Sequence, residues 1–334
     1  MRLPENLWYP LFESGELRKT PLGLERLGRR FVFWRDARGS AHAQIDRCPH
    51  LGAALSAGRI EGDEIVCPFH GFHFGLDGQC TQVPANGRAT RIPAGLCVKT
   101  FPVHESQGFV WLWWGDASKA TPAPPCFESL QDGDWHHATT VVDWPVHYTR
   151  AIENQLDCAH LPFVHHNTIG RGGRTFVDGP YVEADESRIR VWVTTSRDEG
   201  RPSRSQAELA AAAAGREPSL DFLFPGLWLL NIGPSFKNLL AFVPVNEHCT
   251  RYYLRTVHRI GPAWLARPLG WLMGLSNRYI LGQDRRVVLT QTPHSSLDAT
   301  DDRLIGADRA IAQYRRFLRQ RLALPDRDTN PEHP

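Results

Sequence analysis

Two short cysteine–histidine pairs constrain the fold of this 334-residue chain more than any other feature of its sequence. The first pair lies in Cys48-Pro-His50 and the second in Cys67-Pro-Phe-His70, with sixteen residues between them. Two thiolates and two imidazoles suit either a tetrahedral zinc ion or a [2Fe–2S] cluster with histidines on one iron. The sequence therefore predicts two tight loops and, between them, a hairpin that returns the second loop beside the first.

The residues that flank the two pairs favour the iron–sulfur cluster over a zinc ribbon, which is the alternative. Cys48-Pro-His-Leu-Gly-Ala-Ala-Leu and Cys67-Pro-Phe-His-Gly-Phe-His-Phe resemble the two cluster-binding loops of Rieske domains. The resemblance covers most of residues 7–115. It implies that Cys48 and Cys67 hold one iron, while His50 and His70 hold the other.

One departure from other Rieske domains is informative. Respiratory Rieske proteins resemble this array but carry one further cysteine in each loop, and those two cysteines form a disulfide. Ala53 and Phe69 stand at the corresponding positions here. The domain therefore resembles the lower-potential Rieske type of oxygenases and their ferredoxins. His73 lies near the array, and we interpret it as a strand side chain rather than a ligand.

A second group of metal-binding residue types follows in Glu153-Asn-Gln-Leu-Asp-Cys-Ala-His-Leu-Pro-Phe-Val-His165. Asn154, Asp157 and His160 recur at a spacing of three, which predicts one face of a helix. Pro162 then disturbs the helix, so that His165 can turn back toward the same point. Two neutral imidazoles and one carboxylate make the facial triad of non-haem Fe(II) oxygenases, which leaves positions open for O₂ and substrate.

This segment is similar to the N-x-x-D-x-x-H-x-x-x-x-H signature of Rieske oxygenase catalytic domains. The resemblance implies that His160 and His165 are iron ligands and that Asp157 is a carboxylate linking them to an incoming electron. It also places Asn154 near the open face of the iron. His166 is the alternative to His165 as a ligand.

The carboxylate ligand is expected far along the chain. Gly282-Gln-Asp-Arg-Arg-Val-Val-Leu-Thr-Gln291 resembles the late helix that supplies it in the family, with Asp284 in the ligand position. Family members often have Glu where Gln283 stands. The alternative for Asp284 is a solvated carboxylate beside two arginines. Poorer candidates for the ligand lie in a turn-like stretch: Asp298, Asp301 and Asp302.

The order of predicted elements indicates an α+β fold with two domains. Residues 1–118 form an all-β Rieske domain, 119–126 a proline-rich linker, and 127–330 a catalytic mononuclear iron domain. The resemblance implies a helix-grip arrangement of an antiparallel sheet with helices for the second domain. Its strands are expected at 137–144, 188–195, 227–231, 238–245 and 251–258. Its helices are expected at 148–160, 275–288 and 302–322, and the alanine run 208–214 is a short helix or a mobile insertion.

Charge and hydrophobicity exclude other classes of protein. The net charge of +2, from 38 basic and 36 acidic residues, does not provide the basic field that binds nucleic acid. No apolar stretch has the length of a signal peptide or a membrane span, and Trp264 to Leu275 favours a core or interface helix. Seven cysteines, an odd number, favour metal binding over a disulfide scaffold. We therefore expect a soluble, cytoplasmic protein.

The two resemblances together imply the oxygenase component of a Rieske monooxygenase, of the single-subunit type that includes vanillate O-demethylases and pheophorbide-type oxygenases. Such a protein uses O₂ to hydroxylate or demethylate an aromatic or other apolar cyclic small molecule. The sequence lacks a G-x-G-x-x-G fingerprint after a strand and a flavin site, so NAD(P)H and flavin are expected only on a separate reductase or ferredoxin.

The resemblance also implies a head-to-tail homotrimer, in which His70 of one subunit approaches Asp157 of the next. Segment 221–256 is expected to line an apolar substrate pocket. Two alternatives stay open at this point. One is a cis-dihydroxylating dioxygenase α subunit, and the other is a non-catalytic Rieske electron carrier.

Overall fold

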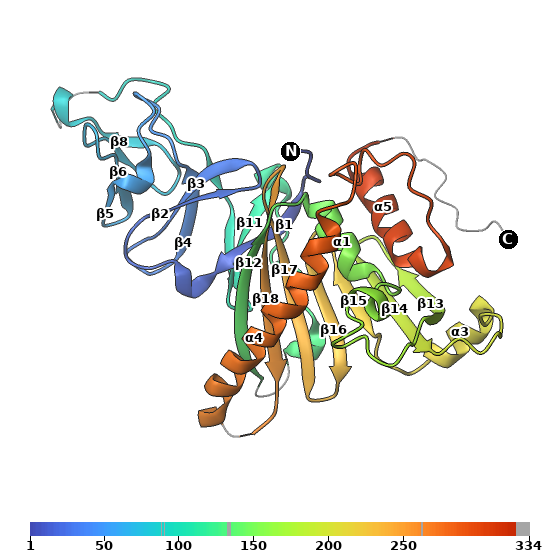
Figure 1. Cartoon of the computed structure of the whole chain (residues 1–334). Coiled ribbons are helices and arrows are strands. Elements are labelled where there is room, and N and C mark those ends of the chain that lie inside the picture. The colour runs from blue at the N-terminus through green and yellow to red at the C-terminus, as the bar shows by residue number, and fades with distance from the viewer. Residues whose placement is uncertain (88, 90, 132–134, 262, 325–334) are drawn as a thin grey trace. The chain divides into compact units, whose positions relative to one another are not determined.

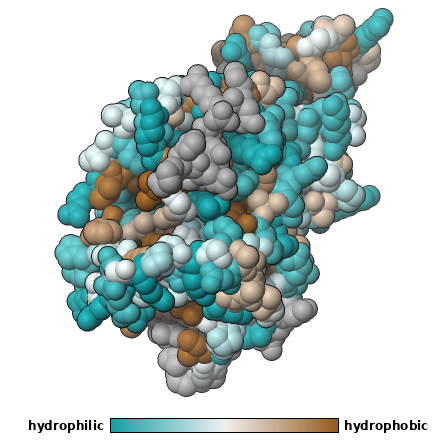
Figure 2. All heavy atoms as spheres, turned by 90° about the vertical axis from the view of Figure 1, so that its right-hand side faces the viewer, coloured by the Kyte–Doolittle hydropathy of each residue, from teal (hydrophilic) through white to brown (hydrophobic). Residues whose placement is uncertain are grey.

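The computed structural model describes residues 1–87, 89, 91–131, 135–261 and 263–324. The chain divides into two compact units: Met1 with Leu3–Pro125, and Arg2 with Cys126–Pro334. The division falls inside the stretch predicted to be a linker. None of the helices in the described residues combines the length and the hydrophobicity that crossing a bilayer requires. Hydrophilic side chains dominate the face of the molecule that Figure 2 shows.

The first unit is built from three antiparallel sheets, in the orders β1-β11-β10, β2-β3-β4-β9 and β5-β6-β7-β8. Its strands are β1 (Leu7–Glu13), β2 (Leu22–Arg26), β3 (Arg29–Arg35), β4 (Ala41–Ile45), β5 (Arg59–Glu61), β6 (Glu64–Val66), β7 (His73–Phe74), β8 (Cys80–Gln82), β9 (Thr100–Phe101), β10 (Val103–Ser106) and β11 (Phe109–Trp114). Its short 3₁₀ turns are η1 (Ser14–Glu16), η2 (Leu55–Ala57), η3 (Pro84–Asn86) and η4 (Ala117–Lys119). The prediction of an all-β N-terminal part is confirmed.

The hairpin predicted between the two cysteine–histidine pairs is formed by β5 and β6. Glu61 pairs with Glu64, so only two residues connect the strands. The first of them, Gly62, has φ +61°, the left-handed conformation that such a tight hairpin turn demands and that glycine adopts without cost. The hairpin carries the chain from the loop after β4 to the loop between β6 and β7.

The second unit is one seven-stranded antiparallel sheet in the order β12-β18-β17-β16-β15-β14-β13, with helices. Its strands are β12 (His136–Trp144), β13 (Phe176–Ala184), β14 (Arg188–Ser196), β15 (Leu220–Leu223), β16 (Leu227–Gly233), β17 (Phe236–Asn246) and β18 (Cys249–His258). Its helices are α1 (Tyr148–Leu156), α2 (Leu161–Val164), α3 (Gln206–Ala213), α4 (Ala263–Val288) and α5 (Arg309–Arg321), with 3₁₀ turns η5 (Glu128–Leu130) and η6 (Gly306–Asp308). The α+β prediction is confirmed.

Two helices cover one face of this sheet beside its longest strands. Helix α4 packs on β12 and β18, α1 packs on β17 and β18, and the two helices contact each other. Figure 1 shows α4 and α1 in front of the sheet. The space between this helical layer and the strands of the sheet is where the second candidate site lies.

The predicted helix over 148–160 is wrong in its last turn. Helix α1 ends at Leu156, and Asp157 caps it with an extended backbone, φ −70° and ψ 123°. Its side chain accepts a hydrogen bond from the backbone N–H of Ala159 at 2.6 Å, a local bond that competes with the helical pattern. The face predicted to carry Asn154, Asp157 and His160 on one helix therefore does not exist as such.

Other helix boundaries also differ from those predicted. The alanine run forms a helix, α3, which begins with a capping box between Ser205 and Glu208. The helix expected at 275–288 begins earlier, at Ala263, and the one expected at 302–322 is confined to η6 and α5. The expected core or interface helix at 264–275 is the first half of α4. Most of its side chains lie outside those that the structure describes, although Leu272 is exposed.

Candidate metal centres

The two cysteine–histidine loops of the first unit are local copies of each other. The backbone N–H of Gly52 donates to the carbonyl of Cys48 at 2.9 Å, and that of Gly71 donates to the carbonyl of Cys67 at 3.1 Å. Both glycines have positive φ, 78° and 68°. In each loop the cysteine N–H also donates, at 2.8 Å, to the carbonyl five residues later. The glycine four residues after each cysteine thus lets the chain turn tightly around a ligand position.

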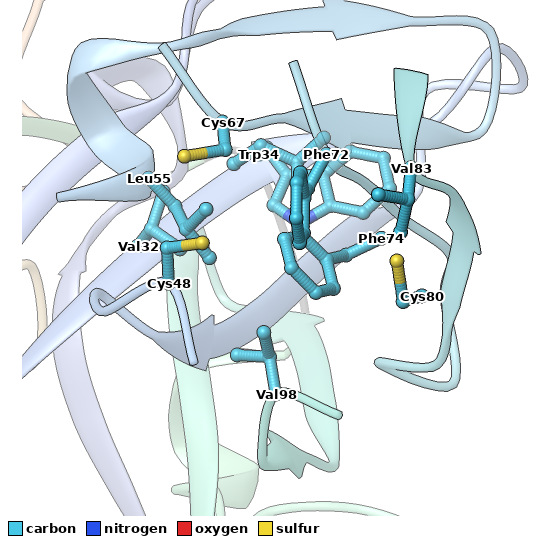
Figure 3. Packing of buried hydrophobic residues seen from close by; sticks show 11 residues of the cluster. Val32, Trp34, Cys48, Leu55, Cys67, Phe72, Phe74, Cys80, Val83 and Val98 are labelled. Carbon is cyan, nitrogen blue, oxygen red and sulfur yellow. The ribbon is translucent and has the colours of Figure 1, made fainter. Parts of the chain in front are cut away.

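The two thiols are buried in a hydrophobic core of the first unit. Cys48 and Cys67 are 2% and 1% exposed. Figure 3 shows their sulfur atoms pointing into one space beside Leu55, whereas the sulfur of Cys80 lies beyond the ring of Phe72. Burial, followed by the neighbouring Cys67, raises the pKa of the Cys48 thiol to about 11. A bound metal has to displace that proton, because thiolates are the ligands.

The two imidazoles of the loops lie at the surface. The ring centroids of His50 and His70 are 4.7 Å apart, and His50 stacks on Phe72 at 4.8 Å. Two buried sulfur atoms and two exposed nitrogens fit a [2Fe–2S] cluster that has its histidine-bound iron outermost. His73 lies on β7 with Nδ1 at 2.8 Å from the carboxylate of Glu64, as expected for a strand side chain.

The second unit brings together His160, His165 and Asp284, with one potential ligand atom of each within 4.8 Å of the others. Oδ1 of Asp284 lies 3.0 Å from Nε2 of His165 and 3.5 Å from Nε2 of His160. The side chains of His165 and Asp284 are only 2% and 3% exposed. Oδ1 of Asp284 is buried and makes no well-aligned hydrogen bond within the described part of the chain. A buried acceptor of this kind calls for a bound partner, so the residues fit a divalent metal with two imidazoles and one carboxylate.

Two helices, α2 and α4, position these ligands. His160 is the residue before α2, and His165 is the residue after it. Pro162 stands in the first turn of α2, where its missing N–H has no helical acceptor to lose, so it starts this helix instead of disturbing the previous one. Asp284 projects from α4, which contacts α2. His166, the alternative to His165, is exposed, and its Nδ1 faces the carbonyl of Phe163 at 2.9 Å.

Asp157 contacts the far nitrogen of one ligand. Its Oδ2 lies 3.5 Å from Nδ1 of His160. Burial would raise the pKa of the Asp157 carboxyl, but His160 and the backbone N–H of Ala159 together lower it below its ordinary value. Asp157 therefore stays ionised and faces the ring nitrogen that does not point toward Asp284.

Gln283 contacts the far nitrogen of the other ligand. Its Oε1 lies 2.9 Å from Nδ1 of His165 and accepts a hydrogen bond from Oγ1 of Thr168 at 2.9 Å. Its Nε2 donates to Oδ1 of Asn167 at 2.8 Å. Burial would lower the pKa of His165, but Asp284 and Gln283 raise it. Each imidazole thus has a polar side chain on its outer nitrogen, as metal-ligating histidines usually do.

Asn154 does not join this group. Its Oδ1 accepts a hydrogen bond from Nε2 of Gln155 at 2.9 Å, and it is not among the described residues that line the cavity beside the ligands. The three weaker aspartate candidates also lie elsewhere. Asp302 pairs with Arg150 and Arg315, each at an N–O distance of 2.7–2.8 Å.

A cavity of about 510 Å³ reaches the second centre, and its lining includes Asp157, His160, His165 and Asp284. Its other walls are mostly apolar and come from both layers of the unit, with examples Trp228, Leu230, Phe236 and Leu240 on the sheet and Ile280 and Leu281 on α4. Segment 221–256 supplies part of this lining, as predicted. The walls from β14, Ser219, Leu220 and α4 were not predicted from the sequence.

The role of Gln283 was also missed, since the sequence shows it only as a departure from a family pattern. A signal was present, because Gln283 adjoins Asp284 and can accept a hydrogen bond. Its contact with His165, however, joins residues distant in sequence and is visible only in the folded unit.

Comparison with protein families gives two matches. Residues 7–102 match the Rieske [2Fe-2S] domain, and residues 144–324 match the vanillate O-demethylase oxygenase C-terminal domain. Among individual proteins, chlorophyllide a oxygenase of Chlamydomonas reinhardtii is 38% identical over 50% of this chain and 25% of its own length. The vanillate O-demethylase oxygenase subunit of a Pseudomonas species is 31% identical over 50% of this chain and 47% of its own length. The chain thus spans a quarter to about half of the length of these two relatives.

A longer match is 4beta-methylsterol monooxygenase of Methylococcus capsulatus, 29% identical over 84% of this chain and 78% of that protein. Solved structures share the fold. NdmA of Pseudomonas putida CBB5 superposes with a TM-score of 0.76 at 22% identity, covering 94% of this chain and 89% of its own. Dicamba monooxygenase bound to 3,6-dichlorosalicylic acid gives a TM-score of 0.76 at 21% identity, covering 97% and 98%.

Proposed function

This chain belongs to the Rieske non-haem iron oxygenases, and from that membership we propose that it is the oxygenase component of a monooxygenase. In this proposal it uses O₂ and electrons from NAD(P)H to hydroxylate or oxidatively demethylate an aromatic or other apolar cyclic molecule. The observation that supports it most is the presence of two different donor sets in one chain. One is a thiolate–imidazole array, and the other is an imidazole–carboxylate triad beside an apolar cavity.

The site residues are assigned within this proposal. Cys48, His50, Cys67 and His70 hold the [2Fe–2S] cluster, and His160, His165 and Asp284 hold the mononuclear Fe(II). When bound, the mononuclear iron supplies the redox chemistry that activates O₂, with coordination positions left open by a three-residue ligand set.

The protein's own side chains orient, shield and connect this centre. Gln283 holds the outer nitrogen of His165 at 2.9 Å, which fixes the orientation of that ring. Asp157 faces the outer nitrogen of His160 at the longer distance of 3.5 Å. The apolar walls of the cavity exclude water from the reacting atoms and hold the substrate. Asp157 also links the centre to the incoming electron. We do not assign Asn154 to the open face of the iron, because its amide is directed to Gln155.

The electrons reach the chain from outside in this proposal. A separate reductase or ferredoxin carries the flavin and oxidises NAD(P)H. The subunits assemble as a head-to-tail homotrimer. In it, electrons pass from the cluster beside His70 of one subunit to the mononuclear centre beside Asp157 of the next. The cytoplasmic location stays a prediction.

The names of the relatives support monooxygenation. They include an O-demethylase subunit, a 4beta-methylsterol monooxygenase and a toluene-4-sulfonate monooxygenase subunit, the last of them putative in its own description. Their names span small aromatic acids and large sterols. The names therefore do not define one substrate class, and the chain's own cavity has to indicate it.

The test is a screen of aromatic and alicyclic methyl ethers and hydrocarbons with a surrogate reductase, following NADH oxidation together with product. With labelled ¹⁸O₂ we expect one labelled atom in a hydroxylated product, or labelled formaldehyde from a demethylated one. Two labelled atoms in a cis-diol would replace the proposal by dihydroxylation. The cluster and the mononuclear site together predict roughly three irons per chain, and roughly two irons with no turnover would indicate an electron carrier.

A further inference from the structure

Charged side chains in the cavity beside the mononuclear centre are confined to one end. Among the lining residues whose side chains the structure describes, the titratable or charged ones besides Cys158 are the two aspartates and two histidines of the metal centre. No lysine or arginine is among them. Four basic residues directly adjoin lining residues in the chain without being among them: Lys237, Arg255, Arg278 and Arg285. Nζ of Lys237, on β17, pairs with the carboxylate of Glu217 at 3.1 Å. Lys237 is not a lining residue, whereas its neighbour Asn238 is.

This arrangement selects against anions. A carboxylate or sulfonate that enters the cavity loses its hydration and meets hydrocarbon walls, with no cationic side chain among those described to replace the water. The aspartates at the metal end add repulsion. A neutral molecule meets none of these costs and gains from the burial of its apolar surface.

The volume of the cavity indicates the size of the occupant. An apolar cavity of about 150 Å³ is large enough to bind benzene. The cavity here is about 510 Å³, so a single ring would leave most of it empty. Roughly three ring-sized units fit this space, and a two- or three-ring molecule contacts the sheet wall and the α4 wall together.

The polar groups on the sheet wall are neutral. Thr195 on β14, Ser219 just before β15 and Asn238 on β17 line the cavity. The hydroxyl of Ser219 already accepts a hydrogen bond from the backbone N–H of Val193 at 3.3 Å. The side-chain oxygen of Asn238 is buried and has no hydrogen-bond partner within the described part of the chain. An amide with an unused oxygen is suited to accept a hydrogen bond from the O–H or N–H of an uncharged hydroxyl or amide group.

We infer that the substrate is an uncharged molecule of two or three rings, with a neutral polar group that Asn238 binds, and that the site discriminates against aromatic carboxylates and sulfonates. That the bound molecule is a substrate rests on the proposed function. The binding preference itself is independent of turnover.

The test compares the binding of matched neutral and anionic probes. Protein that contains its iron is kept anaerobic without reductant, and the dissociation constants of 6-methoxy-2-naphthamide and 6-methoxy-2-naphthoate are measured by equilibrium dialysis at neutral pH. We expect the amide to bind at least about tenfold more tightly than the carboxylate, and also more tightly than the one-ring 4-methoxybenzamide. Equal or tighter binding of the carboxylate overturns the charge inference. Equal or tighter binding of the one-ring amide overturns the size inference.

Two neighbouring threonines on β14 provide a matched pair of variants. Thr195 lines the cavity, whereas Thr194 is exposed and does not. Because side chains alternate along a strand, the two substitutions place the same charge on opposite faces of the sheet. Thr195→Lys should shift the amide-to-carboxylate preference toward the carboxylate by about tenfold, while Thr194→Lys should leave it unchanged. An equal shift in both variants, or in neither, contradicts a preference set by the cavity wall.

Asn238→Leu tests the polar anchor. The variant should weaken the binding of 6-methoxy-2-naphthamide by about fivefold to tenfold and leave that of 2-methoxynaphthalene, which lacks the amide, within twofold. Parallel losses for both probes would mean a distorted cavity and would remove Asn238 as the anchor. If the amide binds as expected but no turnover follows with any reductase, the proposed oxygenase function fails while the binding inference stands.

Discussion

The contacts of Gln283 determine which nitrogen of His165 can bind a metal. Nε2 of Gln283 donates to Asn167, so its Oε1 faces His165 and Thr168. An amide oxygen only accepts hydrogen bonds, so His165 carries its proton on Nδ1. The lone pair on Nε2 of His165 is then free on the side of Asp284, where the metal is expected.

Replacing Gln283 should therefore weaken metal binding. We expect Gln283→Leu to lower the affinity for Fe(II) or Co(II) by about 10–100-fold, because the ring of His165 loses the acceptor that orients it. Gln283→Glu keeps an acceptor and should retain most of the affinity. The measurement is an anaerobic metal titration of protein depleted of mononuclear iron, with the exposed Gln291→Leu as control. Unchanged affinity in Gln283→Leu would show that Gln283 does not position the ligand.

Asp157 is predicted to act in electron delivery more than in holding iron. It contacts His160 through the nitrogen that faces away from Asp284, at 3.5 Å, and is not in the triad itself. Asp157→Ala should keep the cluster and the mononuclear iron while turnover falls by roughly 100-fold or more. Iron assay and low-temperature EPR of the reduced cluster are the measurements, and exposed Asp301→Ala is the control. Turnover close to that of the wild type would refute the linking role.

At the scale of elements, helix α1 and the break after it decide where the second centre lies. The helix is anchored at its C-terminal end, where the indole N–H of Trp228 on β16 donates to the carbonyl of Gln155 at 2.9 Å. Its start is capped by His147, whose side chain accepts from the backbone N–H of Thr149. Each end of α1 is thus held by a hydrogen bond from or to a side chain. The side chain at the start, His147, can titrate.

The cap at His147 should make stability depend on pH. Burial, only partly opposed by Glu247 and Asp298 and assisted by Arg2, lowers the pKa of His147 from 6.5 to about 4. The unfolded chain therefore binds more protons than the folded one between pH 6.5 and pH 4. The stabilisation is fully present above pH 6.5 and is lost as the pH falls toward 4, up to about 3 kcal/mol.

Urea unfolding across this pH range measures the effect. His147→Asn keeps a capping side chain but cannot titrate, so its free energy of unfolding should fall less steeply between pH 6.5 and pH 4 than that of the wild type. The surface substitution His248→Asn should reproduce the wild-type slope. Parallel curves for His147→Asn and the wild type would exclude His147 as the titrating cap.

At the scale of the whole molecule, the residues proposed for each metal centre lie within one of the two units. The thiols and imidazoles of the cluster site come from the first unit, and the triad comes from the second. Two inactive variants can therefore be made that each damage one centre and leave the other intact. The proposed homotrimer predicts that these variants rescue each other.

We expect Cys48→Ala, which lacks the cluster, and Asp284→Ala, which lacks the mononuclear iron, to be inactive alone. Co-expressed with different affinity tags and purified through both, they should regain turnover, because an intact cluster of one subunit would serve an intact triad of its neighbour. Light scattering on the same sample should give the mass of a trimer. Mixed trimers without activity would contradict transfer between subunits, and a monomer would contradict the assembly.

Local sequence was enough to predict the parts of each site that lie within a few residues of one another. The cluster loops each repeat a cysteine, a histidine and a glycine over five residues, and the hairpin between them follows from the length of the gap. Such features depend on backbone geometry close to the residues concerned. The predicted end of the helix over 148–160 was wrong for a reason that is also local. The Asp157 side chain accepts a hydrogen bond from the backbone N–H of Ala159, and the helix ends at Leu156.

The types of metal-binding residue, their short spacings and the all-β then α+β order of elements follow from the sequence alone. The family resemblance suggested Asp284 as the third ligand, and the tertiary structure brings it to the two histidines more than a hundred residues earlier. Only the tertiary structure decided that Gln283 contacts one of them, and that the cavity wall holds Asn238 and Thr195 but no described cation. The physical reason is that a spacing of a few residues restricts geometry directly. Contacts between distant segments depend instead on how a seven-stranded sheet and the helices on its face pack together, and no short pattern in the chain encodes that packing.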